Sequence, residues 1–217
     1  MTHPRPKPPT LHVLAGVNGA GKSSIGESIY SSKTSRVFNP DTVAKSIRAF
    51  HPDISATLAN AHAWQIGKEL LEQAIEQQKD YRFETTLGGN TIPRLISEAA
   101  EKGHRLHLWF CGLESVDLHL QRVRARREKG GHDIPEDKIR ERWDSSRENL
   151  IRLLPQIDHL RVYDNSFEAD PTEGLTPRPW LVLEMIDQIL TNPADLTATP
   201  DWAVPILAAA MLLHKST

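Results

Sequence analysis

Short apolar runs alternate with longer amphipathic stretches from residue 11 to about residue 166. Short apolar runs bounded by turn residues indicate β-strands, whereas apolar positions three and four residues apart indicate helices. The predicted strands cover residues 11–15, 37–38, 81–85, 106–111 and 160–163, and the predicted helices cover 23–30, 42–50, 66–77, 92–102, 116–128 and 136–154. After a loop over 167–179, one short strand or helix is predicted around residues 180–190. Five strands alternating with helices predict an α/β protein with a parallel sheet covered on both faces and ligands at the carboxyl ends of the strands.

The first predicted strand leads into a glycine-rich turn and then into a helix. This turn, Gly16-Val-Asn-Gly-Ala-Gly21-Lys22-Ser23, has the spacing of a phosphate-binding P-loop. In such a loop, backbone N–H groups surround phosphate oxygens, Lys22 reaches the β and γ phosphates, and the Ser23 hydroxyl binds Mg²⁺. We therefore predict ATP and Mg²⁺ as ligands. The predicted ATP contacts from the loop are Gly16, Asn18, Gly19, Ala20, Gly21, Lys22, Ser23 and Ser24.

The P-loop context predicts a three-layer α/β/α NTPase fold, with a mainly parallel sheet of five or six strands and a lid, similar to nucleotide kinases. Two absences from the sequence favour ATP and a small kinase over a signalling GTPase. The run over 106–111 does not end in the aspartate that holds Mg²⁺ in switch-type NTPases, and no Asn-Lys-x-Asp sequence is available to recognise guanine. Asn165 follows the last predicted strand, where it is expected either to hydrogen-bond adenine or to form an Asx-turn.

Two polar positions follow the next predicted strands and are candidates for the acceptor side of a kinase site. A kinase must orient and deprotonate the acceptor hydroxyl opposite the γ-phosphate, and Asp41 after Asn39-Pro40 is predicted to be that base. Its alternative role is a helix N-cap. Glu84 at the end of the run over 81–85 and Thr86 directly after it are predicted to bind polar groups of the acceptor, with a polar turn as the alternative.

The segment over residues 124–136 places arginines beside Gly130-Gly131 and is predicted to be a lid that closes over the triphosphate and excludes water. Arg126 in this lid and Arg142 beyond it are predicted catalytic contacts to phosphate. His132 is predicted to contact the acceptor, with phosphate binding or capping of the turn as alternatives. The other arginines of the segment are equally compatible with a solvated helix face.

Composition and chain ends narrow the choice of partners. The net charge of −2 gives no basic footprint for nucleic acid, and the apolar stretch near the C-terminus is too short to span a membrane. The single cysteine, Cys111, favours a reducing compartment, so we expect a cytoplasmic protein.

Residues 1–10 are predicted to be a flexible Pro-rich arm, 11–190 the kinase domain, and 191–217 a helical extension packed on the core. Three tryptophans are expected in the core: Trp64, Trp109 and Trp143.

The candidate motifs follow one another in a defined order. They are the P-loop, Asn39-Pro40-Asp41, Phe83-Glu84-Thr85-Thr86-Leu87, Arg126 with Gly130-Gly131-His132-Asp133-Ile134-Pro135, and Asp164-Asn165-Ser166. This ordered set, spanning about residues 11 to 166, resembles the zeta toxin family. The resemblance implies a P-loop kinase that uses ATP and Mg²⁺ to phosphorylate the amino-sugar hydroxyl of UDP-N-acetylglucosamine. It also implies a small antitoxin, here a separate chain, that blocks the nucleotide site.

Carried over position by position, the resemblance assigns the P-loop lysine to Lys22, the catalytic base to Asp41, and the sugar-nucleotide contacts to Glu84 and Thr86. The Gly-Gly-His lid differs from that of the best-known toxins, which leaves the acceptor open. Other hydroxyl acceptors are therefore a second hypothesis, for instance a nucleoside, an antibiotic or a cofactor. A third hypothesis is an ATP-binding switch protein without phosphate transfer.

Overall fold

A computed structural model of the chain describes residues 7–29, 37–128, 134–167, 179–192 and 197–214. Its sheet has six strands in the order β2-β1-β3-β4-β5-β6, the first four of which run parallel to one another. The strands are β1 (Thr10–Ala15), β2 (Tyr81–Thr85), β3 (Arg105–Gly112), β4 (His159–Asp164), β5 (Trp180–Ile186) and β6 (Ile189–Asn192). The predicted α/β fold with a mainly parallel sheet of five or six strands is thus confirmed.

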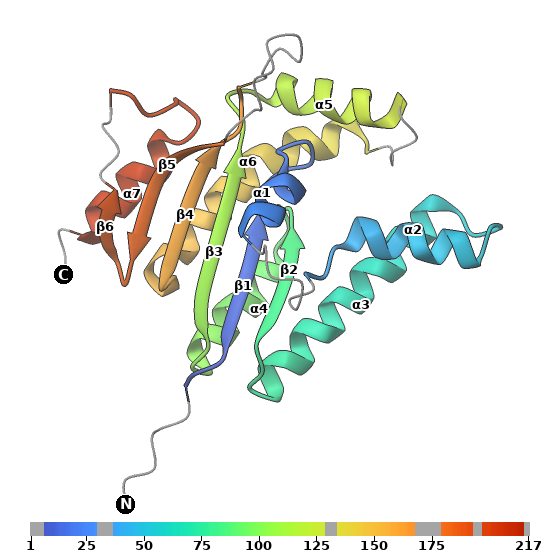
Figure 1. Cartoon of the computed structure of the whole chain (residues 1–217), viewed down its shortest axis with the longest axis horizontal. Coiled ribbons are helices and arrows are strands. Elements are labelled where there is room, and N and C mark those ends of the chain that lie inside the picture. The colour runs from blue at the N-terminus through green and yellow to red at the C-terminus, as the bar shows by residue number, and fades with distance from the viewer. Residues whose placement is uncertain (1–6, 30–36, 129–133, 168–178, 193–196, 215–217) are drawn as a thin grey trace, which may run out of the picture.

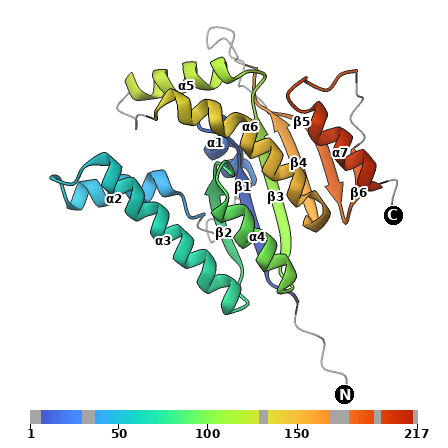
Figure 2. The same ribbon diagram turned by 180° about the vertical axis from the view of Figure 1, so that it is seen from behind.

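Helices cover the sheet unequally on its two faces. They are α1 (Lys22–Ile29), α2 (Pro40–Phe50), α3 (Ala56–Glu76), α4 (Thr91–Glu101), α5 (Val116–Glu128), α6 (Glu136–Leu153) and α7 (Val204–His214), with a 3-10 turn at Leu154–Gln156. Helices α4, α6 and α7 lie on one face and α1 on the other, while α5 lies beyond the carboxyl ends of the strands (Figures 1 and 2). The α2–α3 pair stands beside the β2 edge of the sheet (Figures 1 and 2).

The core lies between the sheet and the α4, α6 and α7 layer. Alternate residues of the parallel strands point into it, including the fully buried Leu11, Leu108 and Leu160. Trp202, which precedes α7, packs so closely on Gly112 that a Cβ at this glycine would lie 2.3 Å from the indole. This contact ties the C-terminal segment to the end of β3. None of the described helices is both long and apolar enough to cross a membrane.

Three predicted elements differ from the structure. The helix predicted over 66–77 is α3, which begins at Ala56 behind the Ser55 N-cap and is therefore longer than predicted. Phe38 forms one bridge with Phe83, in which its N–H donates to the Arg82 carbonyl and its own carbonyl accepts from the Glu84 N–H. The pairing goes no further because Pro40 starts α2 two residues later. The predicted strand over 37–38 is therefore wrong. The segment 180–190, expected to be one short strand or helix, forms the antiparallel β5–β6 pair with positive φ at Asp187 and Gln188 in its turn.

The boundaries of the predicted domains fall partly on residues that the structure does not describe. Residues 1–6 of the predicted arm lie outside the described residues, and Thr10 already belongs to β1, where its N–H donates to Asp80 at 2.8 Å. At the other end, β6 extends to Asn192. The division into arm, kinase domain and C-terminal extension stays a prediction.

Candidate functional site

The P-loop closes over the carboxyl end of β1 with glycines that no other residue could replace without strain. Gly16, Gly19 and Gly21 have φ values of 140°, 86° and 82°. A Cβ at Gly16 would lie 2.2 Å from the Cys111 carbonyl oxygen, and one at Gly21 would lie 2.2 Å from the Asn165 amide nitrogen. The loop is therefore pressed against the ends of β3 and β4, as a phosphate-binding loop on a parallel sheet requires.

Three side chains hold this loop from below. Cys111, buried on β3, donates its S–H to the Ala20 carbonyl at 2.8 Å, and burial raises its pKa to about 12, so the thiol stays protonated. Asn165 donates to the same carbonyl at 2.9 Å. This contact makes Asn165 a support of the P-loop instead of an Asx-turn, which Asp164 forms with Ser166. Adenine binding by Asn165 stays a prediction.

The third support, His119 on α5, was not among the residues selected from the sequence. Its Nδ1 lies 2.8 Å from the Asn18 carbonyl oxygen, which can only accept, so Nδ1 carries the proton. His119 is 1% exposed, and burial lowers its pKa to about 4. A histidine within a basic helix gives no local sequence signal of this role, because the contact joins residues 101 positions apart.

The buried neutral His119 predicts a loss of stability in mild acid. Its folded-state pKa lies below its unfolded value, so the unfolded chain binds the proton first and stability falls as the pH drops from about 6.5 towards 4. Between pH 7 and pH 5 the loss from this group is about 2 kcal/mol. His119→Asn keeps a donor for the Asn18 carbonyl without titrating. Urea unfolding at both pH values should therefore show a loss smaller by about that amount in the variant, and an equal loss would contradict the assignment.

Lys22 and Glu84 face each other at the start of α1. The Lys22 ammonium donates to the carbonyls of Gly16 at 2.8 Å and Val17 at 3.4 Å. Burial lowers the pKa of Lys22, and the Glu84 and Asp41 carboxylates oppose that shift. Burial raises the pKa of Glu84, against the effect of Lys22. The two carboxylates and the ammonium thus form one coupled charge cluster at the P-loop.

The hydroxyl predicted to bind Mg²⁺ lies in the same cluster. The Ser23 and Asn39 side chains lie beside the Glu84 carboxyl group and lower its pKa, against the larger effect of burial. A hydroxyl beside a carboxylate suits a hard cation whose remaining ligands are phosphate oxygens and water. Elsewhere the described residues contain no group of three or more histidines, cysteines or acids arranged for a metal ion. Ser23 with Glu84 is therefore the set that fits Mg²⁺, and binding of the ion stays a prediction.

Asp41 lies in the first turn of α2 but does not cap it. The cap is Asn39, whose Oδ1 accepts from the backbone N–H of Asp41 at 2.9 Å and of Thr42 at 3.2 Å. The alternative reading of Asp41 as an N-cap is therefore wrong, and its carboxylate is available for other partners. It forms an ion pair with Arg126 of α5 at 3.4 Å, and both side chains are less than half exposed to solvent. The predicted base and a predicted phosphate contact thus meet across the site.

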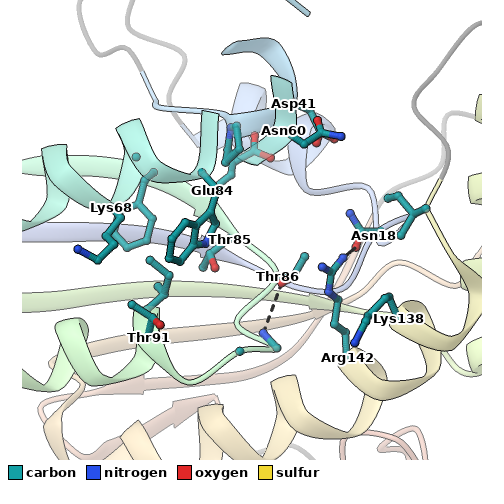
Figure 3. A pocket seen from close by; sticks show the side chains of 18 of the residues that line it. Asn18, Asp41, Asn60, Lys68, Glu84, Thr85, Thr86, Thr91, Lys138 and Arg142 are labelled. Atoms are coloured by element: carbon teal, nitrogen blue, oxygen red, sulfur yellow. Dashed lines mark hydrogen bonds between the residues drawn. The ribbon is translucent and has the colours of Figure 1, made fainter. Parts of the chain in front are cut away.

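The second predicted arginine meets the P-loop directly. Arg142 of α6 donates to the Asn18 side-chain oxygen at 2.9 Å, and burial lowers its pKa. Figure 3 shows Arg142 and Asn18 pointing toward one another, with Lys138 beside them. Arg142 of α6 thus contacts the P-loop and Arg126 of α5 contacts Asp41, and phosphate binding by both arginines stays a prediction.

A pocket of about 570 Å³ extends from Lys22 and Asp41 along the inner side of α3. Its lining includes Thr86 and the β2–α4 turn on one wall, with Asn60, Trp64 and Lys68 of α3 on the other. Figure 3 shows Asp41 and Asn60 at one side of this space, and Lys68 and Thr91 at its far end. The volume is enough for a multi-part small molecule.

Trp64 corrects another prediction. It is 44% exposed and lines this pocket, whereas Trp109 is buried as expected and Trp143 is partly buried beneath the Arg147 guanidinium. Trp64 lies seven and eleven residues before Leu71 and Ile75, and so on the same side of α3, but at this earlier point that side borders the pocket instead of the core. Helical periodicity alone marks an apolar residue without showing whether the sheet covers it.

Most predicted site residues thus converge on one end of the pocket. The P-loop residues, Asp41, Glu84, Arg126 and Arg142 are brought together, and Thr86 lies on the adjoining wall. Of the predicted lid, Arg124 pairs with Glu136, which begins α6. His132 and Gly130-Gly131 lie outside the described residues, as does the Ser24 side chain.

The sequence is similar to one described family and to a bacterial relative. A family model described as zeta toxin matches residues 1–170. An uncharacterized protein of Haemophilus influenzae is 34% identical over 128 residues, which are 59% of this chain and 88% of that protein. The matched range contains all of the motifs described above.

Solved structures with the same fold are much less similar in sequence. The AvrRxo1-ORF1:ORF2 complex with ATP matches with a TM-score of 0.66 and 14% identity, covering 97% of this chain and 77% of that chain. The PezAT toxin-antitoxin system of Streptococcus pneumoniae matches with a TM-score of 0.54 and 14% identity, covering 81% and 76%. A putative kinase of Chloroflexus aurantiacus gives 0.54 and 12%, covering 77% and 95%. At such identities the similarity shows the fold alone.

Proposed function

This chain belongs to the zeta toxin family, and from that membership we propose that it is an ATP-dependent kinase of a small hydroxyl compound. The preferred acceptor is UDP-N-acetylglucosamine or a related UDP-sugar, phosphorylated on a sugar hydroxyl. The protein would act as the toxin of a pair whose antitoxin is a separate small protein. The observation that carries the kinase proposal is the coupled cluster of Lys22, Glu84 and Asp41, which joins a phosphate-binding loop to one end of a substrate-sized pocket.

The contacts support a direct in-line transfer. Asp41 accepts the proton of the acceptor hydroxyl while the hydroxyl oxygen bonds to the γ-phosphorus. The bond from that phosphorus to the β,γ-bridging oxygen breaks at the same time and leaves ADP. Lys22 neutralises charge on the β and γ phosphates. Ser23 would hold Mg²⁺, which when bound would supply further neutralisation of phosphate charge. Asp41 can accept a proton only after Arg126 exchanges this carboxylate for phosphate, so the 3.4 Å ion pair couples the base to the lid arginine.

The pocket dimensions support an acceptor with more than one part. A sugar ring reaching Asp41 and Glu84 would fill only one end, and the wall that includes Trp64 and Lys68 would remain for a second group. An exposed indole on such a wall is suited to stack on a flat ring, and a lysine one helical turn away can approach an anionic group. A nucleotide-sugar carries both features, which favours it over a small monofunctional alcohol.

Removal of the indole should weaken acceptor binding selectively. Trp64→Ala is expected to raise the KM for the nucleotide-sugar by about tenfold, because a stacking contact contributes about 1 to 1.5 kcal/mol. The KM for ATP should change by less than about twofold, since Trp64 lies on the wall away from the P-loop. Trp180→Ala is the matched control, because Trp180 is 47% exposed on β5 and does not line the pocket. A KM change of the same size for both ligands would contradict a stacking role.

An acceptor panel tests the proposed function itself. The protein is incubated with ATP, Mg²⁺ and separately UDP-N-acetylglucosamine, other UDP-sugars, free nucleosides and free amino sugars, and products are identified by mass spectrometry. We expect a mass gain of one phosphoryl group on a UDP-sugar. Phosphorylation of a free nucleoside alone would replace the UDP-sugar as the assigned substrate. If no acceptor in the panel is phosphorylated, the proposed function is overturned. For the toxin role, induced expression in bacteria should arrest growth unless the chain carries a substitution that abolishes transfer.

A further inference from the structure

The turn that joins β2 to α4 contains an unusual backbone and is held by a neighbouring helix. Leu87 has a φ of 58°, a left-handed conformation that is costly for a leucine, and its side chain is fully buried. Such a conformation persists only where surrounding contacts determine it. Those contacts come from α6, the helix that also carries Arg142.

Three consecutive carbonyl groups of this turn accept hydrogen bonds from α6. Asn149 donates its side-chain N–H groups to Leu87 at 2.6 Å and to Gly89 at 3.1 Å. The Ser145 hydroxyl lies 2.8 Å from the Gly88 carbonyl, and it shares its one proton between this carbonyl and that of Glu141 at 2.9 Å. Asn149 is 2% exposed, and Arg152 donates to its side-chain oxygen. This last contact determines which end of the amide faces the turn, so both donors of Asn149 are committed to carbonyls of the turn, and the bond to Leu87 is buried.

The same turn orients the hydroxyls that face the acceptor pocket. The N–H of Leu87 donates to the Thr85 hydroxyl at 3.0 Å, and the N–H of Gly88 lies 3.4 Å from the Thr86 hydroxyl. Because each hydroxyl accepts from the turn, its own proton is left to donate elsewhere, and both threonines line the pocket. Figure 3 shows Thr85 and Thr86 beside Glu84 in this space.

The turn also packs directly against Arg142. A Cβ at Gly88 would lie 2.5 Å from Arg142 Cγ and 3.2 Å from its Cα, so only glycine permits this approach. Arg142, Ser145 and Asn149 are three and four residues apart and therefore share one face of α6. That face thus contacts the P-loop through Asn18 and the acceptor wall through residues 87–89.

We propose that Asn149, assisted by Ser145, is a positioning residue that sets the acceptor-binding hydroxyls of Thr85 and Thr86 relative to the phosphate-contacting Arg142. It acts through the backbone of the turn and contacts neither substrate. This inference rests on the proposed function for its kinetic consequence and on the geometry alone for its structural one. Loss of the hydrogen bonds from Asn149 and Ser145 to residues 87–89 should therefore change the KM and kcat for the acceptor and leave ATP binding intact.

The kinetic test uses Asn149→Asp, which retains size and removes both donors. The KM for the UDP-sugar is expected to rise by about tenfold or more with a fall in kcat, whereas the dissociation constant for ATP stays within about twofold. Ser145→Ala, which loses one donor at a less buried site, should raise the acceptor KM about threefold and covers the case in which the first variant does not fold. Ser146→Ala is the control, because Ser146 is fully buried on α6 and its hydroxyl has no hydrogen-bond partner among the described residues.

Hydrogen exchange tests the inference without any activity. In Asn149→Asp and Ser145→Ala, the amides of Leu87 and Gly88 should exchange several-fold faster, while the Ala20 amide, bonded to Val17 in the P-loop, keeps its wild-type rate. Unchanged exchange at Leu87 and Gly88 in a folded variant, or equal weakening of ATP and acceptor, would overturn the positioning role. If the wild-type protein phosphorylates no acceptor, the proposed function fails while the exchange rates still decide this inference.

Discussion

Replacement of Asp41 by Asn should lower the rate of phosphoryl transfer by about a thousandfold and leave ATP affinity within about threefold of wild type. The reason is that an amide of the same shape no longer accepts the proton of the acceptor hydroxyl, and general base catalysis contributes about 10² to 10⁴. ATP contacts from the P-loop are untouched, and the helix cap is supplied by Asn39. Single-turnover transfer and ATP titration by calorimetry measure the two quantities separately.

Two further variants make this result specific. Asp53→Asn changes an exposed carboxylate between α2 and α3 and should keep full activity. Arg126→Ala removes the ion-pair partner of Asp41 and should reduce transfer by less than Asp41→Asn, if the carboxylate acts as a base and not only as a holder of the arginine. Transfer above about one tenth of the wild-type rate in Asp41→Asn would exclude the catalytic role.

Replacement of Lys22 by Met should reduce kcat/KM for ATP by about 10² to 10³-fold. An ammonium group aimed at the β and γ phosphates stabilises charge that grows in the transition state, and methionine supplies comparable length without charge. The same change should leave the free energy of unfolding equal or higher, because burial lowers the pKa of Lys22 and so disfavours its charged form in the folded chain.

Lys102→Met serves as the control for general loss of positive charge, since Lys102 lies at the exposed end of α4 and pairs with Glu98. Initial rates at varied ATP and urea unfolding curves for the three proteins provide the comparison. A Lys22→Met protein with kcat/KM for ATP within threefold of wild type would remove the P-loop from the transfer site. A large loss of stability would instead indicate that the lysine holds the loop through Gly16 and Val17.

Local sequence patterns predicted the parts of the site whose chemistry depends on neighbours along the chain. A P-loop needs glycines, a lysine and a hydroxyl at set spacings between a strand and a helix, so Gly16, Lys22 and Ser23 were evident from spacing alone. The polar residues after strand ends, Asp41 and Glu84, followed from the rule that ligands bind at the carboxyl edge of a parallel sheet. The same rule predicted the α/β fold.

Contacts between distant parts of the chain explain where the prediction failed. The apolar pair at 37–38 predicted a short strand. Its pairing with β2 ends after one bridge, at Phe38, because Pro40 turns the chain into α2. Trp64 has the periodicity of a core residue, yet α3 stands beside the sheet edge and exposes it to the pocket. Neither outcome depends on local propensity.

By itself, then, the sequence determined the order of the four parallel strands and the helices between them, the phosphate loop and the acids that face it, because each of these follows from spacing within a few residues or from the edge at which parallel strands end. Only the tertiary structure decided which side chains hold these groups in place. His119 supports Asn18 across 101 positions and Asn149 holds Leu87 across 62. Such contacts arise when helices pack on loops, and a buried polar residue is chosen by the backbone group it must satisfy rather than by its neighbours in sequence.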